Sequence, residues 1–433
     1  MNKIEFYKET NFKQTPIGEF PFDWQVVKLK DICIQITDGT HKTPTYVDEG
    51  IPFISTQNIV PFRKGFDFSE YKKYISSEEH RELIKRCKPE KGDILISKCG
   101  TIGRTKLVDV DYEFSIFVGV ALLKLKKDLV SGEYLEQLLN YDPMRVRMEI
   151  SSPGSTRKTL TINAIENLHI PLPKLEEQYR IAEVLSVVDL AVQRTDMVIA
   201  KTERLKKGLM QTLLTRGIGH KEFKDTEIGK IPKTWQIVSL KDVVVEAKSG
   251  FACGQRDENG ILQLRMDNID PEGWINMEAG VKVPPPPDVE HYILKPGDIL
   301  FNNTNSVDLI GKTAIFRGEF PRCVYSNHIT RIRVNQKKIV PEWILYLLIR
   351  KWELGVFKAI CHRHVHQAGI NNEDLLRLKI PLPPIEEQQA IVSTILSNDN
   401  VLKFQRNEKA KLERIKQGLM DLLLTGKIRI RVS

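Results

Sequence analysis

The strongest constraint on the fold of this chain is an internal repeat. The pattern Ile-Gly-x-x-Pro-x-x-Trp within residues 15–31 returns within residues 226–242, so that Trp24 is matched by Trp235 at an offset of 211. Seven of the nine residues in 170–178 recur in 380–388, with an offset of 210. Near-equal offsets at both ends predict two structural units of almost the same length.

Between these shared ends the two copies diverge. A few short matches remain, namely 58–59 with 268–269, 92–95 with 297–300, and 102–105 with 310–313. A similar frame around a dissimilar middle is expected of two modules that share a fold and read different targets.

The segment that closes each copy is predicted to be a long helix. From Glu176 to Thr215 the first spans 40 residues, or about 60 Å at the rise of an α-helix. Apolar residues recur at alternating steps of three and four, which is typical of a coiled-coil seam. The predicted pairing residues are Ile181, Val184, Val188, Ala191, Val198, Leu205 and Leu209, and then Ile391, Asn398, Val401, Gln405, Leu412, Ile415, Leu419 and Leu422.

Two helices this long most simply pair with each other, and an antiparallel pair would relate the two middles by a pseudo-two-fold axis. Asn398 and Gln405 would then lie in the seam and fix its register. The alternative is that each helix packs only on its own domain. An antiparallel pair would act as a spacer between two reading heads.

The two middles are predicted to be mixed α/β. Residues 92–97 and 281–283 have strand composition, whereas residues 132–139 and 341–348 have helical periodicity. The fold class is therefore α+β, with two mixed α/β domains joined by two long helices in an antiparallel coiled coil. The expected boundaries are 1–165 and 221–375 for the domains, and 166–220 and 376–433 for the helical spacers.

Composition limits the environment and the partners of the chain. Among 433 residues, 65 Lys and Arg face 56 Asp and Glu, giving a net charge of +9, which fits a polyanionic partner. The six cysteines form no Cys-x-x-Cys pair, so neither a disulfide framework nor a zinc ribbon is expected. No secretory signal and no membrane span are expected, and a reduced cytoplasm is the simplest location.

Catalytic motifs are incomplete. The proline runs at 284–287 and 383–384 lack the Asn/Asp-Pro-Pro-aromatic order of an amino-methyltransferase. Gly311-Lys312-Thr313 ends like a phosphate-binding loop, but Ser306 stands where the first glycine is required. Glu246-Ala247-Lys248 has no preceding Pro-Asp to complete a nuclease site. The chain is therefore expected to be non-catalytic and to hold no metal or cofactor of its own.

One histidine cluster leaves several interpretations open. His362, His364 and His366 alternate, so in a strand they would share a face that could bind zinc. The first copy has residues 155–159, Ser-Thr-Arg-Lys-Thr, in the matching place. Hydrogen-bond donors in both copies favour a DNA-facing loop, while an ordinary polar surface and a metal site remain the alternatives.

If the target is DNA, Lys and Arg should neutralise phosphates, and polar side chains should read base edges at roughly 1–3 kcal/mol for each bidentate contact. The first-copy candidates are Lys42, Thr43, Lys98, Arg104, Arg157 and Lys158. The second-copy candidates are Arg265, Asn302, Asn303, Asn305, Lys312, His362, Arg363, His364 and Gln367.

Over essentially its full length the chain resembles the specificity subunits of type I restriction–modification systems. The matching motifs are Ile-Gly-x-x-Pro-x-x-Trp before each domain, Gly-Asp-Ile-Leu within it, and Pro-Leu-Pro-x-x-Glu-Glu-Gln at the start of each helix. Residues 38–44, Asp-Gly-Thr-His-Lys-Thr-Pro, also resemble a segment of these domains. The second copy lacks that segment, so its role transfers to one half only.

The resemblance implies a DNA-binding subunit for a bipartite site of double-stranded DNA, with a non-specific spacer between the half-sites. It implies that the paired helices recruit two modification (methyltransferase) subunits, and that restriction (helicase-nuclease) subunits can join. S-adenosylmethionine, ATP and Mg²⁺ are then expected in those partners.

Two other classes of protein compete with this hypothesis. One is a coiled-coil scaffold whose globular heads bind proteins or glycans, against which the net charge and the donor-rich loops argue. The other is a self-contained nuclease–methyltransferase, against which the incomplete motifs argue. Neighbouring methyltransferase and helicase-nuclease reading frames would favour the specificity subunit over the scaffold.

Overall fold

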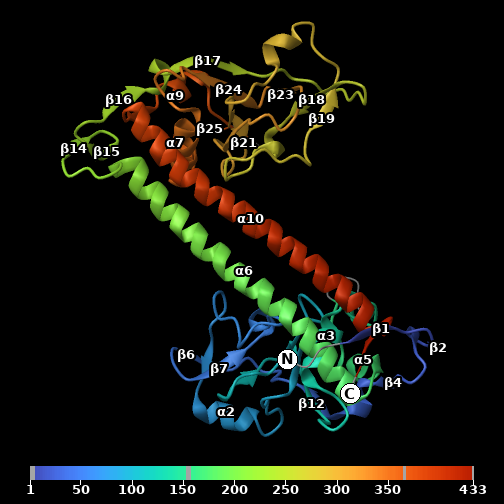
Figure 1. Cartoon of the computed structure of the whole chain (residues 1–433). Coiled ribbons are helices and arrows are strands. Elements are labelled where there is room, and N and C mark those ends of the chain that lie inside the picture. Colours follow the sequence, from blue (N-terminus) through green and yellow to red (C-terminus); the bar gives the residue numbers. More distant parts are fainter. Residues whose placement is uncertain (1–4, 153–157, 364–366, 432–433) are drawn as a thin grey trace. The chain divides into compact units, whose positions relative to one another are not determined.

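The computed structural model describes residues 5–152, 158–363 and 367–431. The chain forms two compact units, unit 1 from residues 1–198 and 405–433, and unit 2 from residues 199–404. The division cuts both long helices, α6 (Leu175–Arg216) and α10 (Ile385–Leu423). Each unit therefore holds one half of each long helix and one globular head, which we call head 1 and head 2 (Figure 1).

Head 1 is built on a four-stranded antiparallel sheet with the order β10-β9-β12-β5. The central strands β9 and β12 are buried nearly throughout, because Ile94–Ile96 and Val120–Leu123 are apolar on both faces. A second small sheet has the order β11-β7-β8-β6, in which β11 and β7 are parallel. The bounds are β5 Cys33–Asp38, β6 Tyr46–Val47, β7 Ile51–Ile54, β8 Tyr74–Ile75, β9 Ile94–Ser97, β10 Thr105–Leu107, β11 Ser115–Ile116 and β12 Val120–Leu125.

Helices cover the main sheet of head 1. The helix α3 begins after Ser131, whose hydroxyl accepts the backbone N–H of Tyr134, as is typical of an N-cap. Its buried face contains Tyr134, Leu135 and Leu138, which belong to the main core of unit 1. The helices are α1 Leu29–Ile32, α2 Ser77–Leu83, α3 Gly132–Asn140, α4 Asp142–Ile150 and α5 Ile162–Glu166.

Head 2 repeats this topology although its sequence differs. Its main sheet has the order β17-β24-β20-β22, and the second sheet has the order β19-β18-β23 with β18 and β23 parallel. The bounds are β17 Val244–Ser249, β18 Ile261–Leu264, β19 Val281–Val283, β20 Ile299–Asn302, β21 Thr304–Asn305, β22 Thr313–Ile315, β23 Cys323–Tyr325, β24 Ile329–Val334, β25 His362–Arg363 and β26 Ala368–Gly369. The helices are α7 Pro341–Glu353, α8 Val356–Ile360 and α9 Asn372–Leu376. The mixed α/β prediction is confirmed for both middles.

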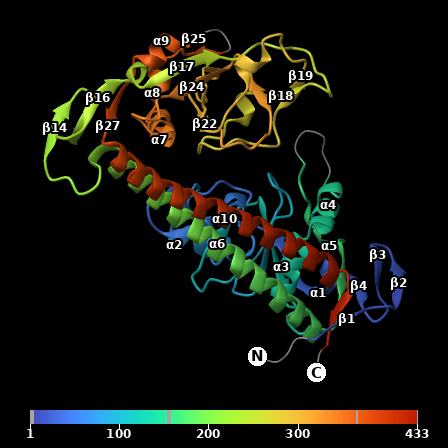
Figure 2. The ribbon, with the colours of Figure 1, turned by 45° about the horizontal axis from the view of Figure 1, so that its top comes forward.

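Short antiparallel pairs frame each head. They are β2 Phe12–Thr15 with β3 Gly18–Pro21 and β4 Gln25–Lys28 with β13 His169–Leu172 in unit 1, and β14 Phe223–Thr226 with β15 Gly229–Pro232 and β16 Gln236–Ser239 with β27 Lys379–Leu382 in unit 2. Unit 1 has one further pair, because β1 (Phe6–Lys8) and β28 (Ile428–Ile430) lie side by side near the two ends of the chain (Figure 2).

The two shared motifs of each copy meet in space. Trp24 donates its indole N–H to Glu177 at 3.2 Å, and Trp235 donates to Glu387 at 2.9 Å. The next residue, Gln178 or Gln388, is fully buried and donates to the carbonyl of the proline two residues before its helix. The sequence motifs are shared because they form the joint between each head and the start of its own long helix.

Both long helices are continuous, with 42 residues in α6 and 39 in α10. The helix expected over residues 176–215 is thus confirmed. α6 ends at Arg216, and the next residue, Gly217, has a φ of +65° that favours glycine; a Cβ there would lie 2.4 Å from the Glu387 carboxylate. Within the described part of the chain, no helix is long and apolar enough to cross a membrane.

Candidate nucleic-acid interface

Each head has an edge where four loops leave the ends of its sheets. In head 1 this loop edge consists of residues 39–45, 98–104, 117–119 and 158–160, and in head 2 it consists of 250–260, 303–312, 326–328 and 367–370 together with β25. Backbone hydrogen bonds brace the loops in the same way in both heads. Lys98 N–H donates to Gly119 and Asn303 N–H to His328, while Leu160 N–H donates to Lys98 and Ile370 N–H to Asn303. These bonds place Lys98 and Asn303 at equivalent positions.

The chemistry at these equivalent positions differs. In head 1, Lys98 Nζ lies 2.5 Å from the carboxylate of Asp38, the last residue of β5. In head 2, the last residue of β17 is Ser249, and Asn303 Nδ2 lies 3.3 Å from its hydroxyl. A buried ion pair in one head is therefore replaced by a neutral polar contact in the other.

Asp38 is the centre of a charged cluster in head 1. Besides Lys98, its carboxylate contacts Arg86 at 2.7 Å and His41 at 3.2 Å. Burial opposes ionisation of this carboxyl, but the hydrogen bonds and charges of Lys98 and His41 hold the pKa of Asp38 below its ordinary value. The cluster fixes the loop that carries Lys42 and Thr43, whose own side chains are exposed.

Four of the residues predicted to contact DNA are buried within the heads. Lys98 pairs with Asp38, and Asn303 donates to Thr330, Asn327 and Ser249. Lys312 Nζ donates to the Ile269 carbonyl at 2.7 Å, and burial lowers the pKa of that amine. Asn302 is fully buried. These side chains brace the loop edges, and contact with DNA would require them to leave their present partners.

The remaining described candidates are exposed or half-buried, and they lie at the loop edges or, for Arg265, directly after β18. Lys42, Thr43, Lys158, His362, Arg363 and Gln367 are exposed, whereas Arg104, Arg265 and Asn305 are half-buried. Arg157, His364 and His366 lie outside the described residues. The two edges thus bring a set of donors together, and contact between individual residues and DNA stays a prediction.

The predicted metal alternative at the histidine cluster rests on three residues, of which only His362 is described. Its Nε2 lies 2.8 Å from the Asp374 carboxylate. In residues 5–152, 158–363 and 367–431, no cluster of three or more His, Cys, Asp or Glu residues has the arrangement of a metal site.

Both apolar packing and ion pairs join the two helices, since residues of α6 and α10 share the main core of each unit. In unit 1, Lys416 lies 2.5 Å from Asp189, and Lys409 lies 2.7 Å from Asp196. As the α6 partner advances by seven residues, the α10 partner recedes by seven, so the helices are antiparallel there. In unit 2, Lys206 lies 2.6 Å from Asp399.

The predicted pairing residues differ in how exposed their side chains are. Val198, Leu205, Val401, Ile415 and Leu422 are between 40% and 56% exposed. Ile181, Ile391 and Asn398 are buried, and Val184, Val188, Ala191, Leu209, Gln405, Leu412 and Leu419 are half-buried. Ion pairs as well as apolar residues thus lie between the two helices. A signal for the ion pairs was present, since Asp189 and Lys206 recur as Asp399 and Lys416 at the repeat offset of 210.

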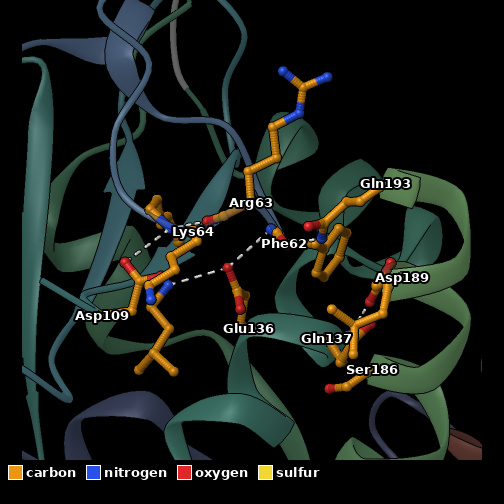
Figure 3. Close-up of a pocket in the computed structure, with 12 residues that line it drawn as sticks. Phe62, Arg63, Lys64, Asp109, Glu136, Gln137, Ser186, Asp189 and Gln193 are labelled. Atoms are coloured by element: carbon orange, nitrogen blue, oxygen red, sulfur yellow. Dashed lines mark hydrogen bonds and ion pairs between the residues drawn. The ribbon is translucent and has the colours of Figure 1, made fainter. Parts of the chain in front are cut away.

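Each head also contributes to these ion pairs. Gln137 in α3 donates to Asp189 at 2.6 Å, and Tyr346 in α7 donates to Asp399 at 2.8 Å. In unit 1 the contact borders a cavity of about 320 Å³, in which Glu136 and Gln137 from α3 face Asp189 and Gln193 from α6 (Figure 3). Burial raises the pKa of Glu136, although the N–H groups of Phe62 and Leu107 and the charge of Lys106 oppose that rise.

In each unit an aromatic side chain of the head lies against a lysine of α10. The Lys416 ammonium lies 3.2 Å from the centre of the Phe62 ring in unit 1. In unit 2, Trp274 takes the corresponding place, with Arg317 at 4.1 Å and Lys403 at 4.6 Å from its ring. Such cation–π contacts add to the attachment of each head to its helices.

The fold and the repeat match known proteins. The family model for the type I restriction modification DNA specificity domain matches twice, over residues 21–201 and 232–414. The type I restriction enzyme MjaVIII specificity subunit of Methanocaldococcus jannaschii is 31% identical over 456 residues, covering 99% of this chain and 98% of the relative. The EcoKI specificity subunit of Escherichia coli is 20% identical over 442 residues, covering 95% and 90%.

Two solved structures resemble the fold. The type I restriction–modification S subunit from M. genitalium has a TM-score of 0.60 at 14% identity, covering 92% of this chain and 96% of that one. A chain from a structural study of complex assembly and conformational transition in the type I R-M system has a TM-score of 0.53 at 20% identity, covering 94% and 99%.

Proposed function

Because this chain belongs to the family of type I restriction–modification DNA specificity subunits, we propose that each loop edge reads one half of a bipartite DNA site. Chemistry then belongs to partner subunits, and this chain is non-catalytic. The observation that carries the proposal is the contrast between Asp38–Lys98 and Ser249–Asn303. Two heads of one topology thus brace their loop edges with different side chains, as expected of two readers of different sequences.

The paired helices are proposed to set the spacing of the half-sites and to recruit two modification subunits, which restriction subunits join. Exposed apolar residues on α6 support recruitment, since Val187, Leu190 and Met197 are 62%, 51% and 57% exposed. Apolar groups at this spacing on one helix are typical of a protein-binding face. S-adenosylmethionine, ATP and Mg²⁺ are proposed to bind to the partners, and the complex is proposed to act in the cytoplasm.

The test is an exchange of loop edges. The four loops of head 2 are replaced by those of a relative with a different half-site, and methylated motifs are mapped in a host that also carries the modification subunit. We expect one half of the methylated motif to change while the other half and the spacer stay the same. A change in both halves together would refute separate reading by the two heads.

A further inference from the structure

Head 2 contains a hollow of about 380 Å³ at its loop edge. It lies between the start of loop 250–260, the end of β18 and the turn at 326–328. Its polar lining consists of Gln263, Arg265, Asp267, Ser326, Asn327 and His328. Most of these groups can donate a hydrogen bond.

Arg265 stands at a backbone position that both heads share. It precedes the 3₁₀ helix η3 (Met266–Asn268), and its N–H donates to the Asn268 side chain at 2.8 Å. In head 1, Ser55 precedes η1 (Thr56–Asn58) and donates to Asn58 at the same distance. The backbone is the same, but head 2 places a guanidinium where head 1 has a hydroxymethyl group.

Head 1 fills the corresponding space with aromatic rings. Strand pairing aligns Phe53 with Gln263 and Phe117 with Ser326. The rings of Phe53 and Phe117 pack edge to face at 6.1 Å, and Phe53 is fully buried. In head 2 two smaller polar residues, Gln263 and Ser326, stand at these positions and line the hollow.

The Arg265 guanidinium is incompletely satisfied within the protein. One terminal nitrogen donates to the Cys253 carbonyl at 3.2 Å, and Nε is buried with no acceptor among the described residues. A guanidinium carries five N–H donors, and a buried donor without a partner is unfavourable. The arrangement therefore suits a ligand that brings several acceptor oxygens.

The shape of the hollow favours a phosphate over a base edge as its ligand. Base edges lie inside the grooves of a duplex and are reached by side chains that protrude, whereas phosphates project outward and fit a hollow. A phosphate also accepts two parallel hydrogen bonds from one guanidinium. We propose that Arg265 binds a phosphodiester of the DNA backbone in this hollow, aided by Ser326 and Asn327, and that head 1 has no equivalent anchor.

This inference rests on the proposed DNA reading by the loop edge of head 2. Its test compares Arg265→Ser, which installs the head 1 residue, with the unchanged chain in complex with its modification subunits. Binding is measured against salt concentration for a duplex that carries the methylated motif and for a scrambled duplex. We expect the variant to bind both duplexes about tenfold more weakly, to lower the salt slope by about one, and to leave the methylated motif unchanged.

Three further variants separate the effect of the Arg265 charge from other effects on DNA binding. Arg265→Lys should retain the salt slope, because it keeps the charge. Asp267→Asn should tighten binding, because it removes an exposed carboxylate from the same hollow. Lys295→Ser removes an exposed charge near the opposite end of β20 and should leave the slope unchanged.

Other results would overturn the phosphate site. Relaxed specificity at one base pair would make Arg265 a base reader, and a lower melting temperature with an unchanged salt slope would make it a structural residue. Inorganic phosphate at millimolar concentration should compete with DNA for the unchanged chain more strongly than for the Arg265→Ser variant. Equal competition for both proteins would show that the hollow is not the phosphate site. A complex that binds neither duplex would instead refute the proposed DNA reading itself.

Discussion

Asp189 on α6 and Lys416 on α10 approach to 2.5 Å, and their repeat counterparts Asp399 and Lys206 approach to 2.6 Å. In each pair both side chains are at most 13% exposed. Each aspartate also accepts a hydrogen bond from its own head, from Gln137 or from Tyr346. A single carboxylate thus ties a head, its own helix and the other helix together in each unit.

The Asp189–Lys416 pair should be strongly coupled. Asp189→Ala leaves a nearly buried ammonium without its counter-charge, and we expect a loss of about 3 kcal/mol of stability in unit 1. The exchange Asp189→Lys with Lys416→Asp should recover part of that loss. Hydrogen exchange of the α6 amides near residue 189 measures the effect. Leu205→Ala, at a 56% exposed site, is the control that should change little.

The buried ion pair Asp38–Lys98 of head 1 should be replaceable by a neutral Ser–Asn pair like that of head 2. Asp38→Ser removes the carboxylate that lies 2.5 Å from Lys98, and we expect a loss of about 2–4 kcal/mol. Adding Lys98→Asn installs the Ser–Asn pair of head 2 and should restore most of the stability. A double-mutant cycle from urea unfolding measures the coupling. Equal instability in the single and double variants would show that the two heads are not equivalent at this position.

The sequence was sufficient for the architecture, because the repeat, the proline stop before each helix and the apolar strands each have a direct physical meaning. The Trp24 and Glu177 motifs could be found from sequence, but their contact could not, since 153 residues separate them in the chain. Comparison of the two middles in sequence also could not show that they share one topology. Buried sheet positions accept many apolar residues, so the order of strands persists where sequence similarity does not.

The roles of individual side chains were harder to predict than the helices and strands. Lys98 and Lys312 have the residue type of a DNA contact, yet each lies within hydrogen-bond distance of a partner inside its head. Burial depends on loops that are distant in sequence, so residue type alone could not separate these lysines from the exposed Lys42. Arg265 has the same residue type and is distinguished only by its place in a hollow.

Glu136 should make unit 1 less stable as the pH rises. Burial raises its pKa above the ordinary value of 4.5. The native state therefore binds this proton more tightly than the unfolded chain does, and the stabilisation is complete below pH 4.5 and is lost as the pH rises through the raised value. We expect Glu136→Gln to gain stability relative to the unchanged chain as the pH rises above 4.5. Thermal unfolding at increasing pH tests the sign, and a gain that shrinks as the pH rises would contradict it.

The exposed apolar face of α6 should bind a modification subunit. Val187→Asp with Leu190→Asp places two charges at sites that are 62% and 51% exposed, so the melting temperature of the chain alone should stay within a few degrees. Assembly should weaken at least tenfold, because charges in an apolar interface lose hydration without gaining partners. Sedimentation of the chain with its modification subunit measures assembly. Val245→Asp, at a 72% exposed site in head 2, is the matched control, and equal weakening by that variant would remove α6 as the docking face.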